Sequence, residues 1–590
     1  MNDQMQKLRL RDRIRPYRQA IPEILIYQVV SKVLLTGLLF VLQKLAYLLF
    51  RSAGRAAVTS GDFLFMFTTW QGWVLLVIGF MALLLYTVLD LNAKILLSGN
   101  LLHGERKPFY RTILDSLRQI PRFLQPGGIW IILYVTLLTP MIGIGLSISL
   151  TSGLHIPTFI TSFIQSKWWL NLLYSAGIIA FVLFGISRIF CMHGIILDDM
   201  PAGKAMAQSG RIFRENWKDF LKQHVLFVLR TVLAVIPAFL VVWGIPILVF
   251  VVLSMAVPQL PERLVTLLIA LIGALGTMTV SFLITPFYIM KSTQLYYYYK
   301  SGVSVQYPSE IQRRPWWYKI LLVLIPVFVV GAALHMDRLF DTFFPQESKV
   351  EIIAHRAGGT LAPENTAAGI YAAYEAGADG SEIDIQRTKD DYYVVNHDAT
   401  FARVAGVKKK PKEMTLEEVG QLSVGGEPVA TLEDMLEASA DRVTLFIELK
   451  GETADKRMAE DTVQMLREKG LEDQCVIISL KYDLISYIED NYPDIMTGYL
   501  TFLSLGNTAG LNCDYLALEE ESATGANIEA IHEQGKKVLV WTANNRDSQK
   551  HFLLSDADGL ITDEVTQAVD LKEEIARRTD LERIMDVLLA

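Results

Sequence analysis

The chain has 590 residues, of which 52% are hydrophobic, and its formal net charge is −7. This length exceeds what one core usually supports, and the hydrophobic content is too high for a wholly soluble protein, so a single soluble domain is excluded. The acidic balance also argues against a nucleic-acid partner. Apolar runs dominate as far as about Leu334, whereas Asp and Glu are frequent after Lys349. We therefore predict a membrane part followed by an acidic soluble part.

Residues 1–336 are predicted to form a multi-pass transmembrane domain. A bilayer core of ~30 Å requires about 20 mostly apolar residues in each helix, and about seven stretches meet that requirement. Their centres lie near Leu38, Ile78, Leu138, Ile179, Phe239, Leu271 and Val327. The first stretch is the most interrupted by polar residues, and losing it would reverse the predicted orientation of everything that follows.

The distribution of basic residues predicts the orientation. The N-terminus and the second, fourth and sixth loops hold roughly 19 Lys and Arg, whereas the other loops hold roughly four. Since basic loops stay in the cytoplasm, the N-terminus is predicted to be cytoplasmic in a multi-pass cell-membrane protein. After seven spans, the linker at residues 337–349 and the whole C-terminal domain are then extracytoplasmic.

Residues 350–590 show the alternation of short apolar runs with longer helical patterns that is typical of βα units. The candidate strands are 350–354, 380–386, 443–449, 475–479, 495–500, 514–518, 537–541 and 558–562. They predict a TIM-type (β/α)8 barrel, so the fold class is an all-α transmembrane bundle followed by an α/β barrel. Residues 392–396 follow the second strand too closely for a crossover and should pair with it as a hairpin. Residues 399–430 are predicted to be an insertion.

The cysteines carry no recognisable function. Cys191, Cys475 and Cys513 lack the short paired spacing of a zinc site or a disulfide framework. Cys475 and Cys513 could pair in an extracytoplasmic domain, but we favour two buried free thiols.

Three carboxylates are predicted to form a metal site. Barrel enzymes place their chemistry at the carboxyl ends of the strands. Glu382 and Asp384 are two residues apart, so they share one face of a strand, and they would repel each other inside a barrel unless a cation lay between them. Glu448 on the next barrel strand completes an all-oxygen ligand set. Such a set favours Ca²⁺ or Mg²⁺ over zinc.

Four further side chains are predicted to act beside this metal. His355 and His397 follow strands and have pKa values near neutrality, which suits them to taking and giving protons. Arg356 offers a planar fork for phosphate oxygens. Lys450 could pair with the metal carboxylates or bind phosphate, and we favour the second role.

Six stretches of the C-terminal half resemble, in order, the motifs of the glycerophosphodiester phosphodiesterase family. They are 352–359 (IIAHRAGG), 362–366 (APENT), 377–384 (GADGSEID), 395–398 (VNHD), 446–450 (FIELK) and 540–544 (VWTAN). The resemblance spans residues 350–565 and implies hydrolysis of glycerophosphodiesters to sn-glycerol 3-phosphate and an alcohol. It implies that Glu382, Asp384 and Glu448 bind the divalent metal. It implies that His355 and His397 are the general acid and base.

The resemblance also implies roles for neighbouring residues. Arg356 would hold the phosphate, Glu364 would contact the metal or one of its ligands, and Trp541 would pack against the glycerol. Ala357 stands where the family usually has Gly, which predicts an extra methyl group beside the phosphate and a narrower choice of substrate.

Two other functions are compatible with the same set of residues. The barrel could bind glycerophosphodiesters for a transporter, or it could serve as a catalytically inactive sensor. Retention of every proposed catalytic side chain argues against the sensor. The membrane lipids are predicted partners, and the substrate could come from a lipid or from a wall polymer, since fold and chemistry do not determine the alcohol that is released.

Overall fold

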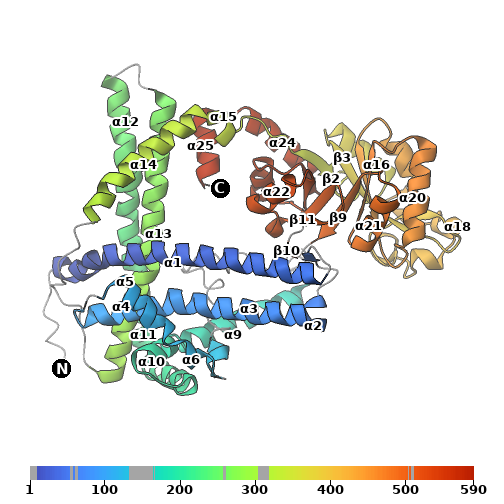
Figure 1. The fold of residues 1–590 in the computed structure, drawn as a ribbon. Coiled ribbons are helices and arrows are strands. Elements are labelled where there is room, and N and C mark those ends of the chain that lie inside the picture. The colour runs from blue at the N-terminus through green and yellow to red at the C-terminus, as the bar shows by residue number, and fades with distance from the viewer. Residues whose placement is uncertain are drawn as a thin grey trace. The chain divides into compact units, whose positions relative to one another are not determined.

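The computed structural model describes residues 10–53, 57–59, 64–105, 107–125, 127–131, 164, 167–256, 261–302, 318–501, 504–506 and 510–589. The chain divides into two compact units (Figure 1). The helical unit comprises Met1–Lys44 and Val74–Phe340, and the barrel unit comprises Leu45–Trp73 and Asp341–Ala590.

The helical unit is built from long apolar helices. Its main elements are α1 (Leu10–Ser52), α3 (Trp70–Thr87), α4 (Ala93–Leu102), α9 (Trp168–Ser187), α10 (Cys191–Leu197), α11 (Ala202–Phe239), α12 (Ile245–Ala256), α13 (Glu262–Ser301) and α14 (Tyr318–Arg338). A short π-helical segment, η2 (Val88–Asn92), joins α3 to α4, and a second, η3 (Leu240–Gly244), joins α11 to α12. The prediction of several apolar helices in this half is therefore confirmed.

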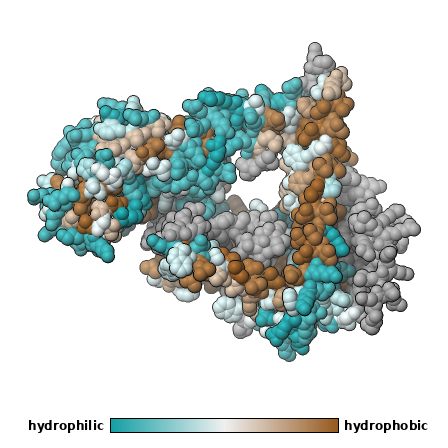
Figure 2. Space-filling model, turned by 180° about the vertical axis from the view of Figure 1, so that it is seen from behind, coloured by the Kyte–Doolittle hydropathy of each residue, from teal (hydrophilic) through white to brown (hydrophobic). Residues whose placement is uncertain are grey.

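Five helical runs in the described part of the chain are long and apolar enough to cross a membrane. They are Ala20–Ser52, Trp70–Leu102, Trp168–Leu197, Ala202–Ala256 and Glu262–Ser301. Of the two remaining predicted spans, the one centred near Leu138 lies outside the described residues, and Val327 lies within α14. Large apolar side chains on these runs are exposed, and Figure 2 shows the hydrophobic surface that results. Surfaces of this kind are expected where helices face lipid.

Eight parallel strands in the barrel unit close on themselves. They are β2 (Glu351–Ala354), β3 (Gly380–Arg387), β7 (Thr444–Leu449), β8 (Cys475–Ser479), β9 (Thr497–Thr501), β11 (Tyr515–Glu519), β12 (Lys537–Trp541) and β13 (Gly559–Thr562). Strand β2 pairs with both β13 and β3, which closes the ring. The predicted TIM-type barrel is confirmed.

Bulky apolar side chains fill the barrel. Phe446 on β7 is fully buried and contacts the ring of Tyr515 edge-on, with 5.9 Å between ring centroids. Two larger clusters lie outside the strands, beneath the surrounding helices. Cys475 belongs to one of them and Cys513 to the other, and both are buried free thiols, as we favoured from the sequence.

The predicted hairpin and insertion follow β3. Strand β4 (Tyr393–Val395) pairs antiparallel with β3. The insertion then folds as two short helices, α17 (Ala402–Ala405) and α18 (Leu416–Val419), and a small hairpin of β5 (Ser423–Val424) and β6 (Glu427–Pro428). It has a small hydrophobic core of its own, which includes Phe401 and Val419.

One strand pair joins segments that are far apart in sequence. Strand β1 (Ala57–Thr59), in the segment after α1, pairs antiparallel with β10 (Ser504–Gly506). Strand β10 follows the carboxyl end of β9 in the barrel. The segment after α1 is thus paired with a strand that follows the carboxyl end of β9, which the sequence patterns did not predict.

The packing inside the barrel leads to a stability prediction. Replacing Phe446 by Ala should destabilise the barrel by about 3–5 kcal/mol, because it leaves a cavity among side chains that cannot collapse into it. The melting temperature of the barrel in the full chain should fall by roughly 6–20 °C. Leu480→Ala, at a position that is 37% exposed, is the control and should shift it by little. Equal shifts in the two variants would contradict this account of the core.

Candidate active site

The three predicted metal carboxylates meet at the carboxyl end of the barrel. Glu382 and Asp384 lie on β3 and Glu448 on β7, with Asp384 directly opposite Glu448 in the strand register. All three are buried, with exposed fractions of 3%, 1% and 6%. One oxygen atom from each lies within 4.8 Å of those from the other two.

Burial and mutual repulsion shape the ionisation of this cluster. Burial raises the pKa of Glu448 and of Glu382 well above the ordinary value, and the neighbouring carboxylates raise both further. Burial would also raise the pKa of Asp384, but the Lys450 ammonium group outweighs it, so that pKa lies below the ordinary value. With all three carboxylates ionised, the cluster would carry more negative charge than Lys450 neutralises, and a cation would relieve it.

Lys450 lies between two of the carboxylates. Its Nζ donates to Asp384 Oδ1 and to Glu448 Oε2, each at 2.8 Å. The structure thus contains ion pairs between Lys450 and the proposed metal carboxylates, which was one of the two roles predicted for this residue. An ammonium group has three donors, so one remains for a further acceptor.

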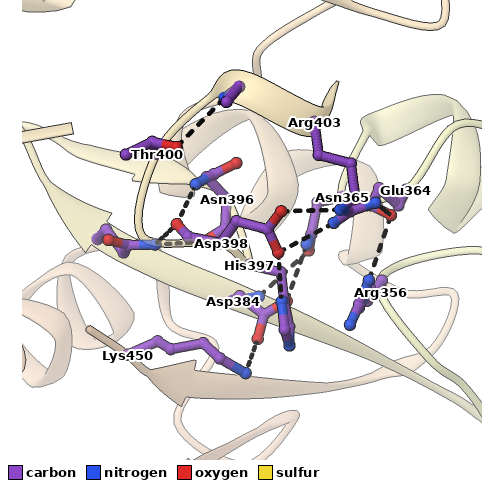
Figure 3. A network of polar contacts seen from close by, with 12 residues as sticks. Arg356, Glu364, Asn365, Asp384, Asn396, His397, Asp398, Thr400, Arg403 and Lys450 are labelled. Atoms are coloured by element: carbon purple, nitrogen blue, oxygen red, sulfur yellow. Dashed lines mark hydrogen bonds and ion pairs between the residues drawn. The ribbon is translucent and has the colours of Figure 1, made fainter. Parts of the chain in front are cut away.

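Asn365 also holds the Asp384 carboxylate in place. Its side-chain Nδ2 donates to Asp384 Oδ2 at 2.8 Å, and its Oδ1 accepts from the Asp384 backbone N–H at 3.2 Å. Asn365 adopts a left-handed backbone with φ of 57°, a conformation that Asn tolerates better than most residues. Figure 3 shows Asn365 and Lys450 on either side of Asp384.

The donor set fits a hard divalent cation. It consists only of carboxylate oxygens, as Ca²⁺ and Mg²⁺ prefer, and it lacks the sulfur or nitrogen ligands typical of zinc sites. Ca²⁺ lies about 2.3–2.6 Å from its oxygen ligands. Oxygen atoms up to 4.8 Å apart could therefore all contact one ion.

His355 follows β2 and is held by Asp563. Its Nδ1 lies 2.7 Å from Asp563 Oδ1, and Asp563 also accepts from the Asn544 side chain at 2.6 Å. With Nδ1 donating to Asp563, Nε2 is left to face the site. Burial lowers the pKa of His355, but the Asp563 hydrogen bond and the Glu382 charge outweigh it, so the pKa is raised.

His397 follows the hairpin strand β4. Its Nδ1 lies 3.0 Å from Asp398 Oδ1. Burial lowers the pKa of His397, and Lys450 and Arg356 lower it further; the charge of Asp384 and the Asp398 hydrogen bond raise it but do not outweigh them, so the pKa is lowered. The two histidines are therefore biased toward different protonation states near neutral pH.

Arg356 and Glu364 belong to a charged network beside the carboxylates (Figure 3). Arg356 donates its backbone N–H to Glu382 at 2.9 Å, and its Nη1 lies 3.3 Å from Glu364. The Nε atom of Arg356 is buried and has no hydrogen-bond partner among the described residues. Such a donor would be satisfied by an anion that enters the site.

Arg403, from the insertion, completes this network. It forms a two-pronged pair with Glu364, with bonds of 2.7 and 2.6 Å, and it also donates from Nε to Asp398 at 2.7 Å. Burial would raise the pKa of Glu364, but Arg403 and Arg356 lower it below the ordinary value. Glu364 therefore pairs with arginines and is not a member of the carboxylate cluster.

Ala357 does not narrow the site in the predicted way. Its backbone is left-handed, with φ of 76°, a conformation that glycine adopts without steric cost. The residue is fully buried and packs in the hydrophobic cluster that contains Ile370. The predicted methyl group beside the phosphate is thus wrong, because the turn directs it into the core.

Trp541 ends β12 beside the end of β11. It is paired in register with Glu519, and its indole N–H donates to the Ala517 carbonyl at 3.0 Å. The side chain is half-buried, so part of it remains accessible.

Four residues around the site were not given roles from the sequence. Asn365 and Asp398 sit inside stretches that were recognised, and Asp563 is a polar residue at a strand end, so each carried a signal. Arg403 carried none, because nothing in the insertion's pattern shows which way the insertion folds.

Comparison with known proteins agrees with this geometry. Residues 355–567 match the glycerophosphoryl diester phosphodiesterase family, and residues 10–333 match the membrane domain of glycerophosphoryl diester phosphodiesterase. The chain is similar to a glycerophosphodiester phosphodiesterase of Caldanaerobacter subterraneus, with 28% identity over 242 residues, covering 38% of this chain and 98% of that protein. It is also similar to one of Bacillus altitudinis, with 26% identity over 245 residues and coverage of 38% and 99%.

A solved structure also resembles part of the chain. It is an Oleispira antarctica phosphodiesterase in complex with the product sn-glycerol-3-phosphate. It is 23% identical, covers 39% of this chain and 98% of its own, and has a TM-score of 0.35.

The raised pKa values of Glu382 and Glu448 predict proton release on cation binding. Because a metal ligand must be deprotonated, Ca²⁺ has to displace protons that these groups retain at pH values where ordinary glutamates are ionised. The Ca²⁺ affinity of the metal-free protein should therefore rise with pH from mildly acidic to neutral conditions. Calorimetric titrations in two buffers of different ionisation enthalpy would measure the protons released. A pH-independent affinity without proton release would contradict this view of the cluster.

Proposed function

This chain belongs to the glycerophosphoryl diester phosphodiesterase family and is a glycerophosphodiester phosphodiesterase with a membrane domain, and from that premise we propose how its barrel performs the reaction. The proposed reaction is hydrolysis of a glycerophosphodiester to sn-glycerol 3-phosphate and an alcohol. We assign catalysis to the domain formed by residues 350–590 and membrane attachment to the domain formed by residues 1–336. The close approach of three buried carboxylates to one another is the observation on which the proposal rests.

Glu382, Asp384 and Glu448 would hold the divalent cation, Ca²⁺ or Mg²⁺. When bound, such an ion polarises a phosphoryl oxygen and stabilises the charge that develops in the transition state. Arg356 would bind the other non-ester phosphate oxygen through its Nε, and Lys450 would donate to one of these two oxygens with its remaining N–H. Trp541 would pack against the glycerol carbons.

His355 and His397 would move the two protons of the hydrolysis. His397, whose pKa is lowered, suits the role of base that accepts a proton from the attacking water. His355, whose pKa is raised, suits the role of acid that protonates the leaving alcohol. The phosphorus–oxygen bond to the alcohol breaks as the bond to the water oxygen forms, so protons and charges balance. Asp563 and Asp398 would orient the two rings through Nδ1.

The proposal is tested by product analysis on the purified full chain. Glycerophosphoglycerol should yield glycerol 3-phosphate, a chelator should abolish turnover, and Ca²⁺ or Mg²⁺ should restore it, since the three carboxylates repel one another without an ion. A transporter or sensor would bind the diester without releasing product. Full turnover in excess chelator would remove the metal from the mechanism.

Substituting the histidines separates proton transfer from binding. His355→Ala and His397→Ala should each lower kcat by ~10²- to 10⁴-fold with a much smaller change in KM, because the metal and Arg356 hold the substrate. His532→Ala is a matched control, since His532 on α22 (Gly525–His532) also pairs with an aspartate, Asp558, at 2.8 Å. Near-normal kcat in either site variant would exclude that histidine as acid or base.

We further propose that the barrel is extracytoplasmic and works at the membrane surface. The excess of basic residues in alternate loops supports a cytoplasmic N-terminus. The pairing of β1 with β10 supports the same topology, because it requires the loop after the first span and the barrel to lie on one side. The chain from Arg338 to Glu351 can span at most ~45 Å, which keeps the site where membrane-attached diesters are concentrated.

Cysteine labelling tests this topology in intact cells or spheroplasts. All three native cysteines are buried, so an introduced surface cysteine gives the signal. Glu468→Cys, on the exposed side of α20 (Lys456–Lys469), should react with a membrane-impermeant maleimide. Glu215→Cys, exposed on α11 in a segment predicted to be cytoplasmic, should react only after lysis. The reverse pattern would overturn the topology, most directly through a miscounted first span.

A further inference from the structure

Arg403 of the insertion joins two acidic side chains from different segments of the barrel unit (Figure 3). Its Nη1 and Nη2 atoms donate to the two carboxylate oxygens of Glu364 at 2.7 and 2.6 Å. Its Nε and Nη2 atoms donate to Asp398 at 2.7 and 3.1 Å. All three nitrogen atoms of one guanidinium group are thus used to hold Glu364 and Asp398.

This arrangement differs from an isolated surface ion pair. Arg403 is 49% exposed, but its partners Glu364 and Asp398 are only 21% and 31% exposed. Isolated exposed pairs contribute little to a protein, whereas two-pronged arginine pairs within a network of charges are the exception. The planar fork of a guanidinium group suits it to bridging two carboxylates, and an ammonium group does not offer the same geometry.

One end of the network reaches His397, the proposed base. Asp398 Oδ1 lies 3.0 Å from His397 Nδ1 and also accepts from Arg403. The main chain here is held independently, because Gln386 donates to the carbonyl oxygens of Asn396 and Asp398 at 2.6 and 2.7 Å. Arg403 therefore acts on the His397 ring through the Asp398 carboxylate, and the course of the main chain does not depend on it.

The other end of the network reaches Arg356, the proposed phosphate ligand. Glu364 Oε2 accepts from Arg403 Nη1 at 2.7 Å and lies 3.3 Å from Arg356 Nη1. The shorter bonds of Glu364 thus go to Arg403. Without Arg403, Glu364 could pair fully with Arg356, and a substrate phosphate would have to displace it. The negative charges of Glu364 and Asp398 would also repel an incoming phosphodiester.

We propose that Arg403 is a positioning residue for the hydrolysis and acts at two points of the site. Through Asp398 it sets the direction of the His397 ring, and through Glu364 it keeps Arg356 available for the substrate phosphate. Arg403 itself contacts neither the substrate nor the cation. The insertion, which has a hydrophobic core of its own, thereby takes part in the reaction. This inference rests on the proposed function, because it assigns Arg403 a part in that same reaction.

Steady-state kinetics of the purified full chain test the proposal, with glycerophosphoglycerol as substrate and saturating Ca²⁺ or Mg²⁺. Arg403→Ala should lower kcat/KM by about 10²-fold, as a small misplacement of reacting groups does. Both constants should change, with KM raised by the loss of the Glu364 contact and kcat lowered by the loss of the Asp398 contact. Arg467→Ala is the matched control, since Arg467 is 45% exposed and also pairs with both oxygens of one aspartate, Asp494. It should leave both constants unchanged.

Removing the charge of Glu364 separates the two contacts. Glu364→Gln alone should change KM little, since Arg403 already neutralises that carboxylate. Added to Arg403→Ala, it should bring KM back toward that of the unchanged chain while kcat stays low, because the Asp398 contact is still lost. Arg403→Lys should likewise spare KM more than kcat, since it keeps the charge without the fork. A purely stabilising role of Arg403 would not produce this split.

The possible outcomes distinguish this inference from the proposed function. Absence of turnover by the unchanged chain would overturn both. Turnover by the unchanged chain, with equal constants in Arg403→Ala and Arg467→Ala, would overturn the inference alone. A large loss of activity in Glu364→Gln by itself would do the same, because it would indicate direct contact of Glu364 with the cation. If Arg403→Ala does not fold, as judged by its melting temperature, Arg403→Lys decides, and an unchanged kcat in that variant would overturn the inference.

Discussion

The active site is organised by one electrostatic problem, which is the placing of three carboxylates in the interior of a barrel. Burial and mutual repulsion both oppose ionisation of Glu382 and Glu448. The surrounding groups reduce that cost, since Lys450 bridges two of the carboxylates and a backbone N–H of the Arg356 turn binds the third. These interactions keep the oxygen atoms together, so that the proposed cation would meet a formed site.

The same constraint explains the unusual backbone around β2. The turn after His355 places consecutive residues, Arg356 and Ala357, in the left-handed region, and this lets Arg356 direct its backbone N–H at Glu382. Gly359 in this turn has φ of 58°, and an added Cβ would lie 2.2 Å from the Asp563 carbonyl oxygen. Strain of this kind is typically kept where function requires it. Here it brings Arg356 and His355, for which we propose phosphate-binding and proton-transfer roles, beside the three carboxylates.

The insertion extends this arrangement beyond the barrel strands. Arg403 ties the insertion to both Glu364 and Asp398, so a segment without barrel strands orients groups next to Arg356 and His397. In the helical unit, Asp90 and Lys94 form a buried ion pair inside an apolar run. Removing one partner of such a buried pair has a large effect, whereas Arg403 in the insertion is half exposed.

The sequence by itself determined the fold class and most of the site. Strand periodicity located all eight barrel strands, and the two-residue spacing of Glu382 and Asp384 placed both on one face, because side-chain direction along a strand is a local property. The apolar runs likewise predicted the membrane part. These inferences depend only on neighbours in sequence, or on the rule that functional residues of a barrel gather at one end.

Only the tertiary structure showed the contacts that depend on how irregular segments fold. No pattern indicated that Arg403 reaches Glu364, that the Ala357 methyl group enters the core, or that β1 pairs with β10. Lys450 was open to two interpretations from the sequence, and only its side-chain hydrogen bonds in the folded barrel showed it between Asp384 and Glu448. Lys32, Tyr86 and Asp90 line one small cavity as a further product of helix packing, because α1 and the segment around η2 are far apart in sequence. Local sequence specifies local geometry, whereas these contacts are set by how separate elements pack.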